Sequence, residues 1–401
     1  MDAEGVPLSA AQAASGAQAA SVAHADVVVV GAGIVGLGAA YAAVRRGLTV
    51  IVLDRTAVPV GATVRNFGHI CIGAQAGDAR RYGDLSRELW LRLGRDAGFR
   101  VRESGTLVAL RHTDELALLE AAAAADGDPR GGIRMLTAEE LLQRAPLRAD
   151  GLVGGALIEG DLQVNPREVA QAIAAHLASA GVDFRFRTAV TSIAPGRIET
   201  TRGAITAGQV VVAVNHDIDQ LLPEVAERAG VVRCALDMMR VAVDLPRPLD
   251  APLLTGWSLV RYGRFASMPE TALLRARLHA ERPDHAALDL NQMYTQLPDG
   301  SLILGDSHAK AVQPGPFQPE AAFDAFATEA RALFECDDIR VLERWQGVYA
   351  AGPDEFLIET PADGVLAIAA TTGIGMTTGL GLAESTLAAH LPAADLQEAS
   401  A

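Results

Sequence analysis

Residues 26–55 read DVVVVGAGIVGLGAAYAAVRRGLTVIVLDR, and this stretch decides the fold. The apolar run from Asp26 to Val30 is typical of a strand, and the Ala-rich segment after the glycines is typical of a helix. A second apolar run, Leu48 to Leu53, ends at Asp54. The order of strand, glycine turn, helix, strand and acid predicts a βαβ unit that binds an adenine dinucleotide.

Three glycines and one acid meet separate requirements of such a site. Gly31 permits a tight turn, Gly33 lets a pyrophosphate approach the backbone, and Gly36 lets the helix pack close to the strand. The helix N-terminus offers free N–H groups to the phosphates. Asp54 follows Gly36 by 18 residues, near the spacing of about 20 expected for an acid that binds ribose hydroxyls. Taken without this context, the glycines also fit an ordinary structural turn.

Length and composition set further limits. The chain has 401 residues, more than the roughly 250–300 at which a single core stops growing, so two domains are expected. The net charge of −15 argues against nucleic acid and anionic membranes as partners. No run of about 18 apolar residues occurs, so no transmembrane helix is expected. Three cysteines suit a reducing cytosol and predict neither a disulfide framework nor a metal site.

The first 25 residues are rich in Ala, Gln, Ser and Gly and have no basic start. They lack the charged and apolar regions of a signal peptide, so we expect a disordered tail and a cytoplasmic protein. Among 34 basic residues only Lys310 is a lysine. An anion site in this chain is therefore expected to use arginine, whose fork of donors suits oxyanions.

Periodicity along the chain predicts the other elements. Helices are expected at 78–98, 113–126, 137–146, 166–180 and 319–334, with Thr137 and Glu140 forming a capping box. Residues 101–110 read as a strand pair that turns at Gly105, residues 182–193 as a strand, and residues 197–215 as a hairpin followed by a buried strand. Residues 231–310 read as an antiparallel sheet with strands at 233–245, 272–280, 291–297 and 301–307. A strand, a second glycine-rich turn and a helix close the chain at 364–391.

The expected architecture is α/β, or α+β overall, with a Rossmann-like nucleotide domain and a second, mainly antiparallel-sheet domain. Residues 26–75, 155–215 and 336–392 are expected to form the first domain. Residues 76–154 and 216–335 are expected to form the second domain, over the reactive end of the cofactor.

Three features favour FAD over NAD. The small and polar residues 61–68 (GATVRNFG) suit a loop along an extended cofactor, and Val190 follows a strand where such folds fix the adenine. Residues 371–381 (TTGIGMTTGLG) open the last helix, whose N-terminus would stabilise an anionic reduced flavin. Each feature alone also fits a turn, a core valine or a glycine-rich helix start, and their order along one chain favours FAD.

The chain resembles the FAD-dependent amine oxidase group that includes D-amino-acid oxidase, glycine oxidase and monomeric sarcosine oxidase. The resemblance is carried by VVVVGAGIVGLGAAYAAVRRG, GATVRNFGHI, LQVNPREVAQAIAAHLASAGVDF and IAATTGIGMTTGLGLAE. GATVRNFGHI is similar to a narrower branch, FAD oxidoreductases encoded beside phosphonate-degradation genes. That branch implies 2-aminoethylphosphonate or its N-methyl form as substrate.

The resemblance implies hydride transfer from the carbon beside the amine nitrogen to FAD, hydrolysis of the imine, and reoxidation by O2. Tyr349 takes the place where glycine oxidase carries an Arg for the substrate carboxylate, which disfavours an ordinary α-amino acid. Gly347 takes the place of the cysteine that sarcosine oxidases bond to flavin, which implies non-covalent FAD.

Candidate site residues follow from these motifs. The cofactor candidates are Gly31, Gly33, Ile34, Val35, Gly36, Asp54, Arg55, Thr63, Asn66, Val190, Gly347, Gly373, Gly375, Met376 and Thr377. The candidates for substrate binding or catalysis are Arg65, Asn66, His69, His308, Lys310 and Tyr349. Arg233, Arg240, Arg261 and Arg264 compete for the anion role, Cys71 and the pair Met238-Met239 are expected in the core, and Trp345 fits either the site wall or the core.

Three rival functions stay open at this point. The chain could be a flavin dehydrogenase for an amino acid or a proline-like substrate that reduces a quinone. It could also be a flavin-binding redox module without catalysis. A flavin monooxygenase would need a NAD(P)H site, and the sequence has no second GxGxxG motif.

Overall fold

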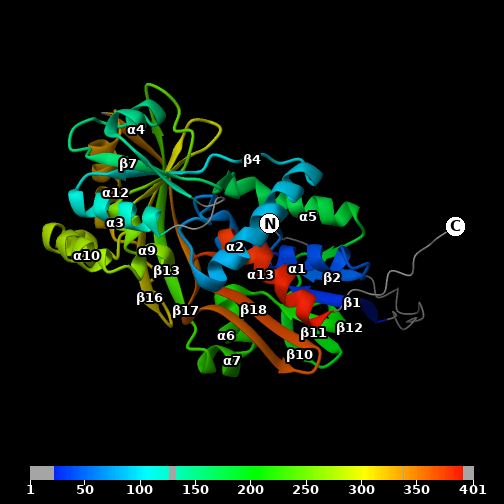
Figure 1. Cartoon of the computed structure of the whole chain (residues 1–401). Coiled ribbons are helices and arrows are strands. Elements are labelled where there is room, and N and C mark those ends of the chain that lie inside the picture. The colour runs from blue at the N-terminus through cyan, green and yellow to red at the C-terminus, as the bar shows by residue number, and fades with distance from the viewer. Residues whose placement is uncertain (1–21, 126–131, 337, 392–401) are drawn as a thin grey trace, which may run out of the picture.

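A large twisted sheet runs through the whole molecule (Figure 1). The computed structural model describes residues 22–125, 132–336 and 338–391. Within that part, 15 strands join in the order β6-β7-β5-β14-β15-β16-β13-β17-β18-β12-β1-β2-β9, with β11 on β12 and β10 on β11. Strands β3, β8 and β4 form a separate three-stranded antiparallel sheet.

The strands are β1 (Ala23–Val30), β2 (Val50–Leu53), β3 (His69–Ile70), β4 (Val101–Arg102), β5 (Thr106–Leu110), β6 (Ile133–Leu136), β7 (Gly154–Ile158), β8 (Leu162–Val164), β9 (Asp183–Arg185), β10 (Val190–Ala194), β11 (Arg197–Thr200), β12 (Gly203–Val212), β13 (Val232–Val243), β14 (Leu253–Leu254), β15 (Met293–Gln296), β16 (Leu302–Ala311), β17 (Ile339–Ala362) and β18 (Val365–Thr372). The α-helices are α1 (Ile34–Val44), α2 (Gly77–Asp96), α3 (Thr113–Ala124), α4 (Ala138–Arg144), α5 (Pro166–Ser179), α6 (Ile218–Leu221), α7 (Pro223–Arg228), α8 (Gly256–Leu259), α9 (Gly263–Ala266), α10 (Glu270–Glu281), α11 (Pro283–Ala287), α12 (Glu320–Leu333) and α13 (Gly375–His390).

The parallel part of the sheet contains the predicted βαβ unit. β1 pairs in parallel with both β2 and β12, and β12 pairs in parallel with β18. Successive side chains of a strand point to opposite faces, and both faces of β1 are covered. Val27 and Val29 pack with α1 and α13, whereas Val28 and Val30 pack with the short helices α6 and α7 on the other face. The α/β fold class predicted from the sequence is confirmed.

Helix α1 is apolar on all sides because it is enclosed on all sides. Ten of its 11 residues are buried, as is expected for a helix that lacks a polar face. It packs against the sheet, α5 and α13, and α13 in turn packs against α2 (Figure 1). This stack places the first turns of α1 and α13 near each other.

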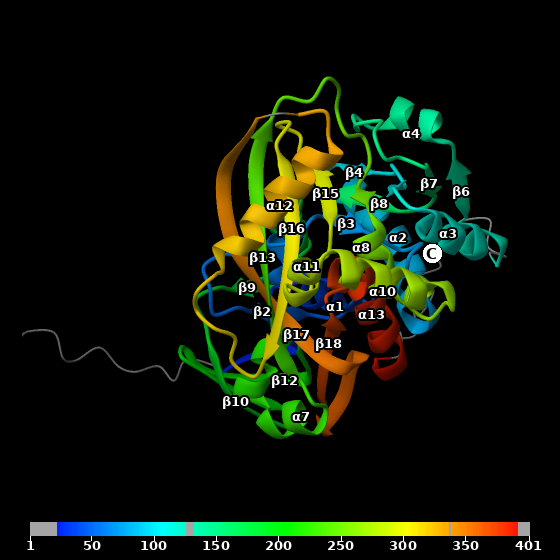
Figure 2. The same cartoon turned by 90° about the vertical axis from the view of Figure 1, so that its left-hand side faces the viewer.

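Strand β17 joins the parallel and antiparallel parts of the sheet. Residues 339–351 pair with β13, and residues 351–362 pair with β18. Figure 2 shows β17 curving from the antiparallel strands β13 and β16 down to β18. Residues near the change of partner, such as Gly347 and Tyr349, therefore lie between the two parts.

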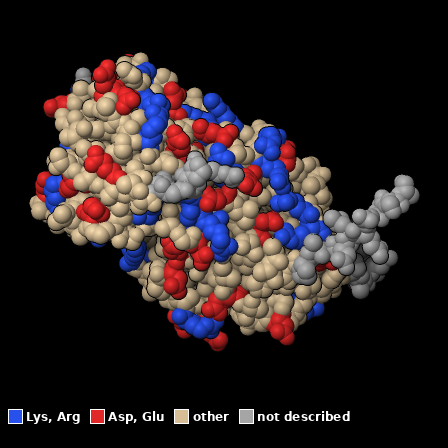
Figure 3. All heavy atoms as spheres, in the orientation of Figure 1, with Lys and Arg blue, Asp and Glu red and all other residues tan. Residues whose placement is uncertain are grey.

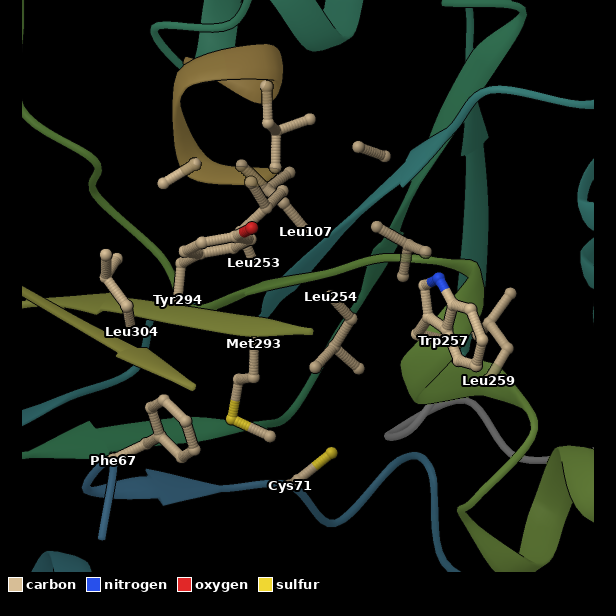
Figure 4. Packing of buried hydrophobic residues seen from close by; sticks show 14 of the residues in the cluster. Phe67, Cys71, Leu107, Leu253, Leu254, Trp257, Leu259, Met293, Tyr294 and Leu304 are labelled. Atoms are coloured by element: carbon tan, nitrogen blue, oxygen red, sulfur yellow. The ribbon is translucent and has the colours of Figure 1, made fainter. Parts of the chain in front are cut away.

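The core of the antiparallel part reaches the loop that follows β2. Phe67 and Cys71 lie beneath Met293 and Leu254 in one buried cluster, with Trp257 at its edge (Figure 4). Cys71 is 3% exposed, as expected for a small core side chain. Met238 and Met239, also predicted in the core, are fully buried.

Several local predictions agree with the structure. The expected helices at 78–98, 113–126, 137–146, 166–180 and 319–334 correspond to α2, α3, α4, α5 and α12. In α4, Thr137 Oγ1 accepts the Glu140 N–H at 3.2 Å, and Glu140 Oε2 accepts the Thr137 N–H at 2.8 Å. In α5, Asn165 caps the N-terminus ahead of Pro166.

Other local predictions were wrong. Residues 272–280 form most of helix α10, because Leu274 and Leu278 are buried four positions apart, a helical spacing. Residues 101–110 do contain two strands, but they do not pair with each other: β4 joins β8, and β5 joins β7 and β14. Residues 182–193 form two strands, with Arg187 between them at φ 53°.

The predicted boundary of the N-terminal tail was also wrong. Strand β1 begins at Ala23, and His24 and Ala25 pair with Thr206 and Ala207. Residues 1–21 lie outside the described residues.

Candidate active site

A cavity of about 940 Å³ runs from the glycine turn after β1 to strands β16 and β17. Its size is at the upper end of the range for ligand pockets. Among the predicted site residues, it is lined by Gly31, Gly33, Ile34, Val35, Asp54, Arg55, Thr63, Arg65, Asn66, His69, Val190, His308, Lys310, Gly347, Tyr349, Gly373, Gly375, Met376 and Thr377. Segments more than 300 residues apart in the sequence therefore meet around one space.

Gly31 and Gly36 shape the nucleotide end by close packing. Gly31 has φ +104°, and a Cβ on it would lie 2.6 Å from Ala213 O. A Cβ on Gly36 would lie 1.9 Å from Gly31 O. Gly36 does not line the cavity, so its role is to let α1 approach the turn.

The side chains of Asp54 and Thr63 form hydrogen bonds with the backbone of this turn and of the start of α1. Asp54 Oδ2 accepts the Ala32 N–H at 2.8 Å, and its Oδ1 accepts the N–H of Thr56 at 2.8 Å. Thr63 Oγ1 accepts the Ile34 N–H at 2.9 Å. Each carboxylate oxygen has more than one lone pair, so Asp54 keeps capacity for a ribose hydroxyl.

Arg55 and Val190 line the same end. The Arg55 guanidinium is 62% exposed and donates to Asp217 Oδ2 at 2.6 Å. Val190 begins β10, next to Thr188 and Ala189 in the cavity wall. This segment therefore belongs to the wall of the cavity at the end of the glycine turn.

The N-terminus of α13 faces the middle of the cavity. Gly373, Gly375, Met376 and Thr377 all line it. The first N–H groups of a helix have no intrahelical partner and carry partial positive charge. Thr377 Oγ1 accepts the Cys71 N–H at 3.0 Å, which joins this helix to the loop after β2. An electron-rich ring edge would be stabilised at this point.

The loop of residues 61–70 contributes Arg65, Asn66 and His69. Asn66 uses its side chain within the loop: Nδ2 donates to Ala62 O and Thr63 O at 2.9 and 2.8 Å, and Oδ1 accepts the Gly68 N–H at 2.7 Å. Its amide therefore shapes the loop. The exposed guanidinium of Arg65 donates to Gln346 O at 3.2 Å, and no carboxylate pairs with it among the described residues.

At the opposite end, strand β16 presents three polar side chains to the cavity. Asp306, His308 and Lys310 are two residues apart and therefore lie on one face of the strand. Asn291 Nδ2 donates to Asp306 Oδ1 at 2.9 Å, and His308 Nε2 lies 3.3 Å from Asp306 Oδ2. The exposed Lys310 is the only lysine of the chain.

Arg261 and Asp289 flank this row. Arg261 donates to Asp289 Oδ1 at 2.6 Å, and His308 Nδ1 lies 2.9 Å from the backbone oxygen of Asp289. Burial opposes ionisation of Asp289, but the charges of Arg261 and His308 outweigh it and lower the pKa of this carboxyl. The pair is therefore ionised beside the cavity at neutral pH.

Tyr349 lies on β17 near its change of partner and is 8% exposed. Burial, followed by the Cys234 thiol, raises the pKa of Tyr349 well above its ordinary value. Its phenol is therefore a neutral group, and its hydroxyl is hydrogen-bonded to the Cys234 sulfur.

The sequence missed several lining residues. Asp306 could have been found from its position two residues before His308, because alternate residues of a strand share a face. Glu355 also lines the cavity, and burial, with a smaller effect of Asp78, raises its pKa. Asp289 and Asn291 gave no signal in the sequence, since they enter through loops.

Only Arg261 of the four competing arginines lines the cavity. Arg233 donates to Asp219 at 2.8 Å, and Arg240 donates to Asp299 and Glu343 at 2.9 and 2.8 Å. Arg264 donates to Gly73 O at 2.8 Å. Trp345 does not line the cavity; Arg167 lies over its ring at 5.2 Å.

Figure 3 shows acidic and basic side chains interspersed over one face of the molecule. In the described part of the chain, every helix is too short or too polar to cross a bilayer.

Comparison with known proteins defines the class. Residues 26–389 match the profile of the family described as FAD dependent oxidoreductase (DAO), and the chain belongs to this family. FAD is therefore its cofactor. The cavity fits FAD, because the close-packed glycine turn, Asp54 and the two helix N-termini lie along one continuous space.

The individual proteins that the chain is similar to share 17–25% sequence identity with it. The chain is 25% identical over 221 residues to one of the subunits of opine oxidase from Rhizobium meliloti; the match covers 50% of this chain and 58% of that protein. The fold is similar to glycine oxidase from Bacillus cereus, with TM-score 0.72, 17% identity, and coverage of 90% of this chain and 93% of that one. Iminodiacetate oxidase from Chelativorans gives TM-score 0.68 at 20% identity, with coverage of 92% and 96%.

Proposed function

We propose that this enzyme oxidises a small primary or secondary amine that also carries an oxyanion, with 2-aminoethylphosphonate or its N-methyl derivative as substrate. The observation that carries the proposal is the row on β16. Asp306, His308 and Lys310 present a carboxylate, an imidazole and an ammonium group to one cavity. Such a row is complementary to a molecule with an amine at one end and an anion at the other.

The anion end would be bound by Lys310, with Arg261 and Arg65 nearby in the wall. Lys310 is exposed, and no carboxylate pairs with it among the described residues. A phosphonate needs several donors, which these side chains supply. His308 lies within hydrogen-bond distance of the backbone oxygen of Asp289 and beside the Asp306 carboxylate, so it would hold the side chains of this row in place.

Tyr349 supports a substrate other than an ordinary α-amino acid. It lies in the cavity wall where the resemblance to glycine oxidase implies an Arg. A neutral phenol does not replace the bidentate bond between Arg and a carboxylate.

Bound FAD supplies the two-electron acceptor for the hydride that leaves the carbon beside nitrogen. We propose that Gly31, Gly33, Ile34 and Val35 bind its pyrophosphate, that Asp54 and Arg55 bind the ribose, and that Val190 binds the adenine. Thr63 and Asn66 would hold the loop along it, and Gly373, Gly375, Met376 and Thr377 would face the flavin ring. Gly347 has no side chain to bond the ring, which supports non-covalent binding.

The overall reaction consumes amine, O2 and water, and releases aldehyde, hydrogen peroxide, and ammonia or methylamine. We also propose that residues 26–75, 155–215 and 336–392 bind FAD and that residues 76–154 and 216–335 bind the substrate. Cys71 and Cys234 are buried thiols outside any disulfide, which supports a reducing cytoplasm.

An amino-acid oxidase or dehydrogenase is the second candidate. It is supported by the names of the relatives, which act on glycine, iminodiacetate and opines. Arg261 in the cavity wall could bind a carboxylate.

Anaerobic mixing of the holoenzyme with a panel of amines tests the proposal. We expect 2-aminoethylphosphonate or its N-methyl derivative to bleach the flavin band, and glycine and D-alanine to leave it unchanged. Bleaching by amino acids alone would favour the second candidate. A holoenzyme that stays yellow with every amine would be a redox module, and comparing O2 uptake with dye reduction separates an oxidase from a dehydrogenase.

A further inference from the structure

Helix α10 brings two basic side chains to the rim of the cavity. Arg275 and His279 are both exposed, and both line the cavity. They are one helical turn apart and therefore lie on one face of α10. A side chain that is open to solvent and also lines a cavity lies at the opening of that cavity. This edge of α10 is therefore part of the cavity mouth.

The other faces of α10 have different neighbours. Leu274 and Leu278 are buried in the core of the antiparallel part. Arg277 points to α3, where its Nε donates to Asp114 Oδ2 at 2.7 Å. The cavity-lining edge of α10 is thus separate from the faces that hold the helix in place.

Two contacts hold the basic side chains beside the cavity wall. Arg275 Nη2 donates to Val260 O at 2.8 Å, and the next residue, Arg261, lines the cavity. The His279 ring stacks on Trp257, with centroids 6.1 Å apart and planes at 16°. A guanidinium has five N–H donors, so the bond to Val260 leaves donors for an anion.

A continuous wall leads from α10 to the row on β16. Figure 2 shows α11 between α10 and β16, and Ala286 of α11 lines the cavity. Asp289 follows in the next loop and pairs with Arg261, and His308 Nδ1 lies 2.9 Å from its backbone oxygen. Lys310 is two residues beyond His308 on the same face of β16.

Positive charge along this wall is not cancelled. Asp289 is paired with Arg261, whereas no carboxylate within the described ranges pairs with Arg275 or Lys310. The whole chain carries a net charge of −15, so it repels an anion at a distance. A cavity wall with an excess of one sign of charge raises the local concentration of ligands of the opposite sign. The wall from α10 to β16 is therefore an approach along which an anion is attracted.

We propose that the edge of α10 that carries Arg275 and His279 is the entry for the anionic substrate. The charge of Arg275 and the ring N–H of His279 attract the oxyanion at the mouth, and the substrate then moves along the wall to Arg261 and Lys310. This inference rests on the proposed oxidation of an amine that carries an oxyanion, and it adds the route by which that substrate arrives. No bond of the substrate changes at this point.

The size of the effect follows from Coulomb's law. In water, a unit charge about 8 Å away favours the approach of a phosphonate dianion by about fivefold and that of a carboxylate by about twofold. The Debye length is about 30 Å at 0.01 M salt and about 3 Å at 1 M salt, so only high salt removes the attraction.

Arg275→Gln tests the charge, because glutamine keeps a donor for Val260 O. We expect the second-order rate constant of anaerobic flavin reduction by 2-aminoethylphosphonate to fall by about fivefold at about 0.01 M salt and to equal that of wild type at about 1 M salt. The limiting rate at saturating substrate should not change, because the reacting groups are the same. Arg275→Lys should restore the rate, and His279→Phe, which keeps a ring on Trp257 but no N–H donor, should show a smaller loss.

Arg228→Gln on α7 is the matched control. Arg228 is exposed, pairs with Glu359 and lies outside the cavity, so this variant also loses one positive charge from the surface. It should behave as wild type at both salt concentrations. An equal loss in both variants would show that only the net charge of the protein matters, and would overturn the entry role.

Binding of methylphosphonate to the oxidised holoenzyme gives a readout without turnover. This anion has no amine, so calorimetry with it measures the attraction of the anion alone. We expect Arg275→Gln to raise the Kd by about fivefold at low salt and to leave it unchanged at about 1 M salt. No change at low salt, or a loss that persists at high salt as for a direct ligand, would overturn the proposal.

The two proposals fail in different ways. A wild-type holoenzyme that no amine reduces would remove the proposed amine oxidation. Binding of methylphosphonate that depends on both Arg275 and salt would still support anion entry along α10 in that case. Flavin reduction by 2-aminoethylphosphonate with the same rate in wild type and Arg275→Gln at low salt would remove the entry role alone.

Discussion

Several side chains near the FAD site form hydrogen bonds with the backbone of the protein. Asn66 bonds three backbone groups of its own loop. Asp54 bonds the Ala32 N–H, and Thr63 bonds the Ile34 N–H. These bonds hold the loop and the glycine turn in one conformation before the cofactor arrives, which reduces the entropy lost on binding.

Arg65 lies in this loop, and its guanidinium pairs with no carboxylate among the described residues. We expect Arg65→Ala to reduce kcat/KM by about tenfold or more, mainly through KM, because a charge-assisted hydrogen bond to the substrate anion is lost. FAD content should change little. Steady-state kinetics and the ratio of flavin to protein absorbance measure the two effects.

Arg81→Ala is a matched control, because Arg81 pairs with Asp78 on the surface of α2 outside the cavity. Loss of FAD with unchanged kinetics in the remaining holoenzyme would instead assign Arg65 to the cofactor.

At the scale of elements, two strands organise the site. β16 places alternate side chains on one face, so Asp306, His308 and Lys310 reach the cavity together. β17 changes partner from β13 to β18, which brings Gly347 and Tyr349 between the two parts of the sheet. The geometry of the site therefore depends on the register of β13 with both neighbours.

Register between β13 and β17 is supported by a charge pair. Arg240 lies opposite Glu343 and donates to it at 2.8 Å, and Arg167 also bonds this carboxylate. The hydrogen bond from Arg240, followed by that from Arg167, lowers the pKa of Glu343 to about 2. Because the pKa of Glu343 is lower in the folded state than its unfolded value of about 4.3, the ionised carboxylate stabilises the folded protein at pH values above about 4.3. This stabilisation is lost as the pH falls toward about 2.

We therefore expect Glu343→Gln to lower the Tm above pH 5, and the gap from wild type to close as pH falls from about 4.5 to 2. The side chain is 39% exposed, so solvent screening should limit the loss to about 1 kcal/mol or less. Thermal unfolding followed by circular dichroism across this pH range measures it. A gap that is constant with pH would contradict the electrostatic explanation.

At the scale of the whole molecule, the cavity depends on distant pieces of the chain. The turn after β1, the loop of residues 61–70, strand β16 and the start of α13 each supply part of its wall. None of these segments encloses a ligand by itself. FAD bound among them should therefore stabilise the entire fold.

Two measurements on the holoenzyme follow. Free FAD at 100 times its Kd should stabilise the protein by about 2.7 kcal/mol, seen as a higher Tm than in the FAD-depleted protein. Acid precipitation should leave the yellow colour in the supernatant, because Gly347 has no side chain to bond the flavin. Colour that stays with the precipitate would contradict non-covalent binding.

The sequence by itself determined the βαβ unit, the acid that follows it, the capped helices and the family. These features depend on spacing within a few turns or one strand, so residue order alone specifies them. Tertiary structure decided that residues 272–280 are a helix. It also placed Thr106 Oγ1 and Asp161 Oδ2 at 2.6 and 3.7 Å from Nε2 of His69. Those residues are 37 and 92 positions from His69 and meet it through pairing of strands, a long-range choice that local periodicity does not encode.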